Sequence, residues 1–180
     1  MRGADIPGES PAMRTVRPAT ALLALQVLAV PAAAQSPDPG SYYKLTTQFR
    51  GTGMPMDVFN GGPRNNQARL DRDQNVSGQN WRFIPTGDGS WRLTTEFRGS
   101  RMCLDINPPT NRPELRPCGN FTGQFWQIVP AGNWVRLTTT FRGPGTCLDI
   151  DPTSDQPELR PCGNYSGQFW RLGRTGRRAQ

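Results

Sequence analysis

Three aspartates stand out as residues that could bind a polar ligand, because each lies between two apolar residues in a short repeated pattern. The patterns are Met56-Asp57-Val58, Leu104-Asp105-Ile106 and Leu148-Asp149-Ile150. Successive side chains of a strand point to opposite faces, so apolar neighbours that face inward would leave each Asp facing outward. A carboxylate accepts charge-assisted hydrogen bonds from two hydroxyl groups at once, which is the chemistry needed to hold a diol.

A second group of candidates lies in a turn that follows each pattern. Two of these turns hold an Asn next to an aromatic residue, which could act as a flat platform with a hydrogen-bonding arm. Equally, the ring could simply cover a nearby disulfide. The residues are Asn120 with Phe121, Asn164 with Tyr165 and, in the first copy, Asn75 with Val76. Each Asn also begins an N-glycosylation sequon, although a repeated turn explains the recurrence more simply.

The first copy has a longer loop ahead of this turn, at residues 60–66. Its amides, beginning with Asn60, could bind hydroxyl groups, although a turn-rich linker without a ligand fits the composition as well. One glutamine follows the turn in each copy, and these complete the candidate binding residues: Gln79, Gln124 and Gln168. We expect the glutamines to hold backbone more than to contact a ligand.

Composition argues against several kinds of catalysis. The chain has no histidine, so Ser-His and Cys-His nucleophilic pairs cannot form. Two carboxylates roughly 5–10 Å apart could hydrolyse a glycosidic bond, but the three aspartates belong to separate repeats and should lie farther apart. Without histidine or a C-x-x-C motif, neither a metal nor another cofactor is expected. We therefore predict a binding protein and not an enzyme.

The segments that must position these residues occur in three copies. A Leu-Thr-Thr-x-Phe-Arg-Gly segment begins each copy, and a Gln-x-Trp segment closes it, at regular spacing. The closing residues are Trp81, Trp126 and Trp170, which we expect in the core. Such self-similarity across the chain indicates an architecture built from internal repeats.

Within each copy, apolar residues alternate with polar ones, which predicts β-strands. In the first strand, Tyr43, Leu45, Thr47 and Phe49 are expected to share one face. Four short strands per copy, separated by Gly- and Pro-rich turns, give roughly a dozen strands that share one core. A propeller or a solenoid is the structural competitor, but propellers usually have four or more blades. We therefore predict an all-β fold, a β-trefoil of three pseudo-threefold repeats at about residues 41–88, 89–132 and 133–172.

Residues 1–34 have the features of a signal peptide. Arg14 and Arg17 precede an apolar run, and small residues follow it, which places cleavage near Ala34. Met13 is an alternative start, and an uncleaved anchor is the alternative to cleavage, although the run is short for a membrane span. The expected protein is secreted or periplasmic, with a single domain at 35–172 and no membrane insertion.

The cysteines agree with export. Cys103 and Cys118 have the same separation as Cys147 and Cys162, and an even count in an exported chain indicates two disulfides. Each loop closure would contribute about 3 kcal/mol.

The formal net charge of +7 suggests an acidic partner, but the arginines are scattered along the chain. The exception is the C-terminus, where we expect residues 173–180 to form a disordered basic tail. Nucleic acid is therefore not expected as a partner.

The Gln-x-Trp segments, together with Cys-Leu-Asp and Pro-Cys at the cysteine pairs, resemble the ricin-type β-trefoil lectin family over essentially all of residues 35–172. The resemblance implies a sugar-binding module with one shallow pocket per repeat and the repeated Asp as a sugar ligand. Two features depart from the family. The aromatic residue that stacks on the sugar is replaced by Asp71, Arg116 and Arg160. The Asn that often precedes the Gln is replaced by Gly78, Gly123 and Gly167.

Two hypotheses follow. The retained aspartates favour a secreted carbohydrate-binding protein whose weak sites act together on a polysaccharide or glycan. The absent stacking aromatics favour a degenerate trefoil, which would bind an acidic glycan or a protein partner through exposed arginines such as Arg116 and Arg160.

Overall fold

The computed structural model describes residues 36–179, so the expected signal peptide at 1–34 lies outside the described residues. The described part contains twelve strands, four short 3-10 helices and no α-helix. None of its helices is long and apolar enough to cross a membrane.

Each repeat contributes four strands in chain order. The first repeat has β1 (Ser41–Thr47), β2 (Met56–Val58), β3 (Ala68–Leu70) and β4 (Trp81–Pro85). The second has β5 (Trp91–Thr95), β6 (Met102–Asn107), β7 (Arg112–Pro117) and β8 (Trp126–Ala131). The third has β9 (Trp134–Thr139), β10 (Gly143–Ile150), β11 (Pro157–Pro161) and β12 (Trp170–Arg178). The 3-10 helices are η1 (Gly62–Arg64), η2 (Ser77–Gln79), η3 (Thr122–Gln124) and η4 (Ser166–Gln168).

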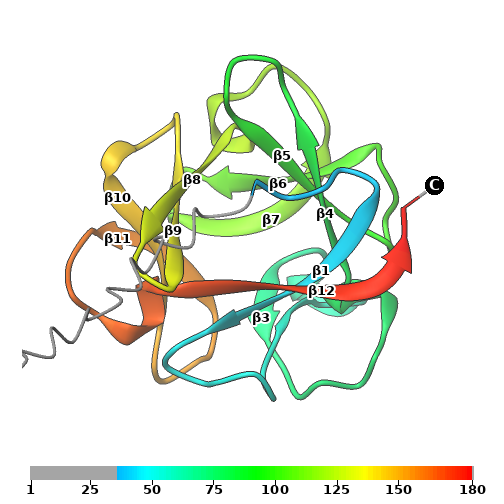
Figure 1. Ribbon diagram of the computed structural model, residues 1–180, viewed down its shortest axis with the longest axis horizontal. Helices are drawn as coiled ribbons and strands as arrows, with labels where there is room; N and C mark the ends of the chain where they lie inside the picture. The colour runs from blue at the N-terminus through cyan, green and yellow to red at the C-terminus, as the bar shows by residue number, and fades with distance from the viewer. Residues whose placement is uncertain (1–35, 180) are drawn as a thin grey trace, which may run out of the picture. The chain divides into compact units, whose positions relative to one another are not determined.

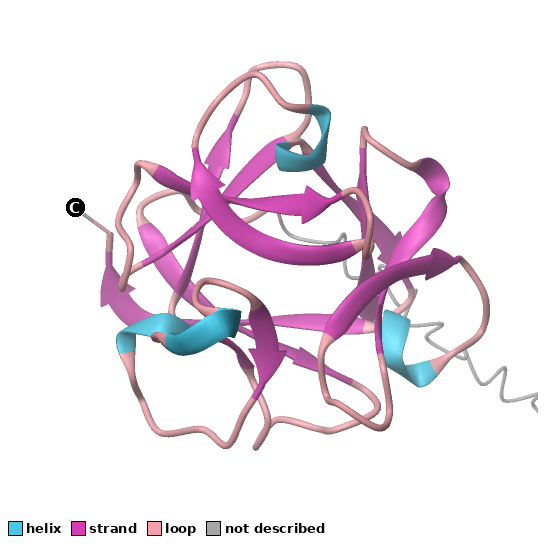
Figure 2. Ribbon diagram, turned by 180° about the vertical axis from the view of Figure 1, so that it is seen from behind, coloured by secondary structure: helices cyan, strands magenta, loops and turns pink. Residues whose placement is uncertain are grey.

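Two strands of each repeat close a barrel. Hydrogen-bonded neighbours run β12–β1–β4–β5–β8–β9, and β9 pairs in turn with β12. The other strands form three hairpins, β2–β3, β6–β7 and β10–β11. The repeats surround a central axis (Figure 1), and the view from behind shows 3-10 helices in all three lobes (Figure 2). The predicted β-trefoil is therefore confirmed.

The repeated tryptophans connect the barrel to the hairpins. All three are fully buried, as predicted, and each indole N–H donates to a backbone carbonyl on the second strand of its own repeat. The pairs are Trp81 to Met56 (2.7 Å), Trp126 to Leu104 (2.8 Å) and Trp170 to Leu148 (2.9 Å). A buried Trp needs such a partner, so each ring both fills the core and fixes the hairpin beside it.

The first strand of each repeat ends earlier than the apolar alternation predicts. β1 ends at Thr47, and Phe49 lies in the following turn with 37% of its surface exposed. The turn is stabilised because Gly51, at φ +71°, donates its N–H to the Thr47 carbonyl at 2.9 Å. The Thr47 hydroxyl also accepts a hydrogen bond from the Arg50 amide at 3.2 Å. Equivalent glycines adopt the same positive φ after β5 and β9.

The prediction of a disordered tail is wrong for residues 173–178. They belong to β12, which pairs along β1 from Thr47 opposite Trp170 to Ser41 opposite Arg178. Arg174 also donates to the Asp38 carboxylate at 2.6 Å. A barrel must cover the free edge of its first strand, so backbone pairing outweighs the polar composition of this segment.

A ring of backbone hydrogen bonds joins the three hairpins. In each hairpin a leucine N–H donates to the carbonyl of a residue in the preceding repeat, and every acceptor has a positive φ, a conformation that Asn and Asp tolerate better than most residues. The pairs are Leu70 to Asp155 (2.7 Å), Leu115 to Asn66 (2.8 Å) and Leu159 to Asn111 (2.8 Å). These bonds fix the three candidate binding regions relative to one another.

Candidate functional site

The three aspartates occupy equivalent places on the hairpins, but they are not freely exposed acceptors. Asp57, Asp105 and Asp149 are only 4%, 5% and 6% exposed, because the 3-10 helix of the same repeat covers them. The aspartates predicted to point outward are therefore largely covered, although Asp57 and Asp149 still line hollows on the surface. In each case Oδ1 accepts the backbone N–H of the next residue, at 2.7–2.8 Å.

Glycine beside each aspartate makes this conformation possible. A Cβ at Gly78, Gly123 or Gly167 would lie 2.2–2.3 Å from Oδ1 of the neighbouring Asp, which is far inside van der Waals contact. The Asn that the lectin family often has at this position could not be accommodated without moving the carboxylate. The glycine and the conformation of the aspartate beside it therefore depend on each other.

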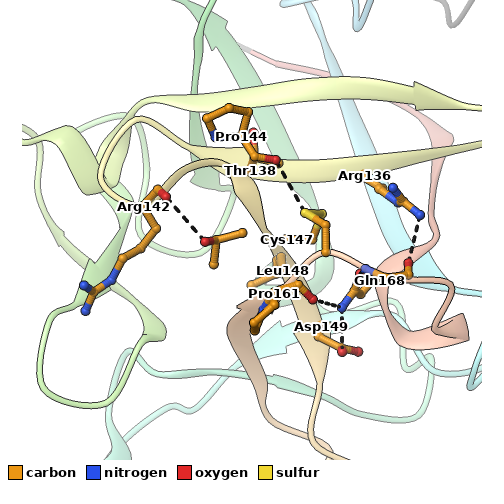
Figure 3. The surroundings of a disulfide bond; sticks show 12 residues. Arg136, Thr138, Arg142, Pro144, Cys147, Leu148, Asp149, Pro161 and Gln168 are labelled. Carbon is orange, nitrogen blue, oxygen red and sulfur yellow. Dashed lines mark hydrogen bonds between the residues drawn. A yellow bond between two sulfur atoms is a disulfide. The ribbon is translucent and has the colours of Figure 1, made fainter.

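The candidate glutamines are fully buried and hold the aspartates in place. Their Nε2 atoms donate to Asp Oδ2 at 3.5, 3.2 and 3.0 Å in the first, second and third repeats. They also donate to a carbonyl at the end of the third strand or in the loop after it, at 2.7–3.0 Å. Figure 3 shows Gln168 between Asp149 and Pro161. Gln79, Gln124 and Gln168 thus organise the site and do not face a ligand.

Both predicted disulfides are present, Cys103–Cys118 and Cys147–Cys162, each with a Cα–Cα distance of 5.0 Å. In the third repeat, Gly163 follows the second Cys and donates its N–H to Gln168 Oε1 at 2.8 Å. Its carbonyl accepts from Arg136 at 2.8 Å (Figure 3). The disulfide therefore fixes the loop that carries Asn164 and Tyr165.

The first repeat holds the same loop without a disulfide. Asp73 takes the place of the second Cys, because its N–H donates to Gly53 as that of Cys118 donates to Arg101, both at 3.0 Å. Lys44 Nζ then donates to Asp73 Oδ1 at 2.8 Å and to Gln79 Oε1 at 3.0 Å. The hydrogen bond from Lys44 lowers the pKa of the Asp73 carboxyl. We call this group, Lys44, Asp73 and Gln79, the ionic clasp.

A hollow of about 380 Å³ lies on the third repeat. We call it the third-repeat hollow. Asp149 and Arg160 come from its hairpin, and Asn164, Tyr165 and Ser166 from the turn before η4 and its first residue. Tyr165 is 62% exposed, and the edge of its ring lies against Gly163. The ring therefore covers the loop after the disulfide and still presents most of its surface to solvent.

A hollow of about 370 Å³ lies at the equivalent place on the first repeat. This first-repeat hollow is lined by Asp57, Arg69, Asn60, Gln74 and Val76, among others. The predicted loop residue Asn60 thus joins the predicted Asp57. Asn75 is exposed but does not line the hollow.

In the second repeat, Phe121 is exposed and its ring lies against Gly119, as Tyr165 lies against Gly163. Asn120 lines a different hollow of about 460 Å³, which includes Asp88 and Arg92. The predicted neighbours Asn120 and Phe121 therefore do not reproduce the arrangement around Tyr165.

Each of the two equivalent hollows is completed by a phenylalanine from the repeat that follows it around the axis. Phe97 lines the first-repeat hollow, and Phe49 lines the third-repeat hollow. Phe49 is positioned by its own N–H, which donates to the Ser166 carbonyl at 3.2 Å. Arg50 lies over the Phe49 ring at 4.3 Å from its centroid and also donates to the Pro152 carbonyl at 3.1 Å.

Sequence reasoning missed both phenylalanines as site residues. Their signal was present in the repeated Leu-Thr-Thr-x-Phe-Arg-Gly segment, but the alternation placed them in the core. The exposed ring of Phe49 and the partly buried ring of Phe97 supply the aromatic surface that the hairpins themselves lack.

Arg116 and Arg160 are already ion-paired. Arg160 donates to Glu158 and, at 3.1 Å, to Asp151, while Arg116 donates to Glu114. These pairs reduce the capacity of both arginines to attract an anionic ligand.

The first repeat reverses this charge pattern. Arg69 lies opposite Asp57 in the hairpin and contacts Asp71 at 2.6 Å, whereas Asp149 lies opposite Glu158. Arg69 is 3.9 Å from Asp57 Oδ2, yet burial dominates and raises the pKa of the Asp57 carboxyl. The two hollows therefore have equivalent places and similar volumes but differ in electrostatics.

No protein-family model matches the chain, and no curated protein matches it by sequence. Solved structures do resemble it. The chain is 17% identical to a GlcNAcα1-4Gal-releasing endo-β-galactosidase from Clostridium perfringens, with a TM-score of 0.64 over 75% of this chain and 32% of that one. It is 24% identical to the designed threefold-symmetric protein ThreeFoil, with a TM-score of 0.59 over 73% of this chain and 97% of that one. It is 12% identical to the Polyporus squamosus lectin, whose structure is bound to a human-type influenza-binding epitope. The TM-score is 0.63 over 76% of this chain and 50% of that one.

These comparisons show the β-trefoil fold. The chain spans about a third of the galactosidase and about half of the lectin.

Proposed function

We propose that this is a secreted carbohydrate-binding protein with a lectin-like role. The observation that carries the proposal is the pair of equivalent hollows, each of which gathers a carboxylate, a guanidinium, an amide side chain and an aromatic ring. Few polar groups around an apolar surface are typical of small-molecule sites. A sugar needs both kinds of contact, because its hydroxyls form hydrogen bonds and its C–H groups pack on aromatic faces.

The structural neighbours agree with this proposal. One is named as a lectin bound to a glycan epitope, and another as an enzyme that acts on a galactose-containing glycan. The trefoil covers only part of those proteins, so the likeness supports a glycan-binding module and no particular sugar.

The competing function is binding of acidic glycans through exposed arginines. Arg116 and Arg160 are the arginines at the family's stacking position, and both are held by carboxylates of their own repeat. An anionic ligand would have to displace these partners. The ion pairs therefore favour recognition of hydroxyl groups over recognition of negative charge.

A glycan array of the oxidised protein, residues 35–180, at low and raised salt tests the proposal. Binding to neutral glycans that survives raised salt is expected. It should weaken in Asn60→Ala or Asn164→Ala, which alter the hollows, and persist in Val129→Thr, an exposed position outside both hollows. Binding only to sulfated or uronic-acid glycans, with loss at raised salt, would favour the arginine-based alternative. An array without any bound glycan would contradict the lectin role.

A further inference from the structure

The third-repeat hollow offers a ligand more aromatic surface than the first-repeat hollow. Tyr165 and Phe49 both line it, with 62% and 37% of their surfaces exposed. In the first repeat, Val76 occupies the position equivalent to Tyr165. Phe97 is therefore the one aromatic residue among those that line the first-repeat hollow. Aromatic side chains dominate the energy of small binding surfaces, so this difference should make the two hollows unequal.

The carboxylate in the third-repeat hollow has little capacity left to accept hydrogen bonds from a ligand. Asp149 Oδ1 accepts the Ile150 N–H at 2.7 Å, and Oδ2 accepts from Gln168 at 3.0 Å. The residue is 6% exposed. Each oxygen could accept one more hydrogen bond, but the covered Asp cannot accept from two adjacent sugar hydroxyls through both oxygens at once. Recognition must therefore depend on ring contacts more than on a carboxylate–diol pair.

Ring contacts select sugars by the orientation of their hydroxyls. In a β-gluco-configured pyranose the hydroxyls are equatorial, so the axial C–H bonds give both faces of the ring an apolar centre. A galacto-configured pyranose has an axial hydroxyl that makes one face polar. A site with two aromatic residues gains from the first arrangement, because both rings can contact C–H groups of one sugar.

The charges around the third-repeat hollow argue against an acidic sugar. Arg160 is shared by Glu158 and Asp151, and Asp149 adds a third carboxylate. Arg112 lies 3.5 Å from Glu158, and Arg50, over the Phe49 ring, pairs with Asp155 at 2.7 Å. These three guanidiniums thus already have carboxylate partners, although the whole chain is strongly basic. A uronic acid would have to compete with these carboxylates for a cation.

We infer that the third-repeat hollow is the principal sugar site and that it takes a neutral, gluco-configured pyranose, with Phe49 and Tyr165 as the side chains that pack on it. The inference rests on the proposed function and makes it specific. It also places the main site where the first repeat meets the last, because Phe49 belongs to one and Tyr165 to the other.

The experiment is an NMR titration of the ¹⁵N-labelled, oxidised protein with three matched probes: methyl β-glucoside, methyl β-galactoside and methyl β-glucuronide. The glucoside is expected to shift the amide signals of Gly163, Asn164 and Ser166. Its affinity should exceed those of the other two probes by about fivefold or more, the size of one aromatic contact.

Tyr165→Ala and Phe49→Ala should each weaken glucoside binding by about five- to tenfold. Phe121→Ala is the matched control, because this exposed ring lines neither hollow, and it should leave glucoside binding unchanged. Phe49→Leu keeps an apolar side chain in the turn, so a folded spectrum with weakened binding would separate loss of the aromatic face from loss of folding.

Tighter binding of the galactoside or the glucuronide would overturn the inference and leave the lectin role standing. So would glucoside shifts that disappear in Phe97→Ala and persist in Tyr165→Ala. If no probe causes shifts and the glycan array is also blank, the proposed function itself fails and the inference fails with it.

Discussion

The first and third repeats hold the same loop beside the same hollow by different means. The third repeat uses the Cys147–Cys162 disulfide, and the first uses the ionic clasp of Lys44, Asp73 and Gln79. In both, the buried Gln accepts a backbone N–H from the loop and donates to the Asp on the hairpin. The loop geometry is therefore set by the glutamine and the backbone, while the outer fastening can change.

The type of interaction, a disulfide or an ion pair, nevertheless determines how rigidly the loop beside each hollow is held. A disulfide resists pH and salt, whereas a solvent-exposed ion pair is weak and screened. The Gln–Asp hydrogen bond follows the same order, since it is 3.0 Å in the third repeat and 3.5 Å in the first. We expect the third repeat to be the better organised of the two, which agrees with its richer aromatic lining.

The largest expected effect comes from opening the disulfide. Cys147→Ser with Cys162→Ser should lower the free energy of unfolding by about 3 kcal/mol, as estimated for a loop of this length. The matched change, Lys44→Met with Asp73→Asn, should cost less than about 1 kcal/mol, because Asp73 is largely exposed. Urea denaturation of both variants measures the difference. Equal losses would mean that the ionic clasp is as strong as the covalent one.

Much of the fold could be predicted because three copies had to share one core. The repeated Trp81, Trp126 and Trp170 placed the barrel, and the matching cysteine spacing gave the disulfides. The end of β12 could not be predicted, since Arg177 and Arg178 look like a solvated tail. Their place depends on β1, a strand more than a hundred residues away, whose edge needs a partner.

The site was harder to predict, because its details depend on close approaches between segments. Asp149 was placed correctly along its strand, but its carboxylate is covered, because Gly167 without a Cβ lets η4 pack closely against it. Phe49 fits the period of two, but it lies in the turn that the hydrogen bond from Gly51 to Thr47 closes. This turn keeps its ring out of the core. Neither effect is visible in the local pattern of apolar residues.

The next effect in size tests the contact between glycine and aspartate. Gly167→Ala should cost about 2 kcal/mol, because the new Cβ would overlap Asp149 Oδ1 and nearby backbone. Gly78→Ala should cost less, since Asp57 is held by a longer hydrogen bond and can move. Thermal or urea unfolding gives both values.

Gly145→Ala is the control for this comparison, because nothing lies within 4 Å of its added Cβ. Adding Asp149→Ala to Gly167→Ala should recover part of the loss by removing the colliding carboxylate. If the double variant is no more stable than the sum of its parts predicts, the two residues are not coupled.

A smaller difference is expected when each carboxylate becomes an amide. Asp149→Asn should cost about 1 kcal/mol or somewhat more, because an amide N–H₂ would face the Gln168 donor at 3.0 Å. Asp57→Asn should be close to neutral at pH 7. Burial raises the pKa of Asp57, because covering the charged carboxylate is unfavourable, and an uncharged amide avoids this cost.

The sign of this effect can be checked by pH. A raised pKa means that the contribution of Asp57 to stability is present below about pH 4, near its unfolded value, and is lost as pH rises through the folded pKa. Asp57→Asn should therefore gain stability relative to the parent protein as pH rises. A variant that loses stability over that range would show that the Arg69 contact outweighs burial.

The smallest effect separates the two fastenings by acid. Hydrogen bonding to Lys44 lowers the pKa of Asp73, so the clasp contributes stability above the ordinary carboxyl pKa of about 4 and loses it as pH falls through the lowered value. The free energy of unfolding, measured from neutral pH downwards, should therefore fall less in Lys44→Met than in the parent protein. The difference should be well under about 1 kcal/mol, because the pair is exposed.

Amide signals of the first-repeat loop, at Asp73 and Asn75, should move in that pH range, while those of Gly163 and Asn164 behind the disulfide should not follow the same titration. If both loops respond alike, the signals report a general effect of acid on the domain, and the ionic clasp has no separate role in holding the first-repeat hollow.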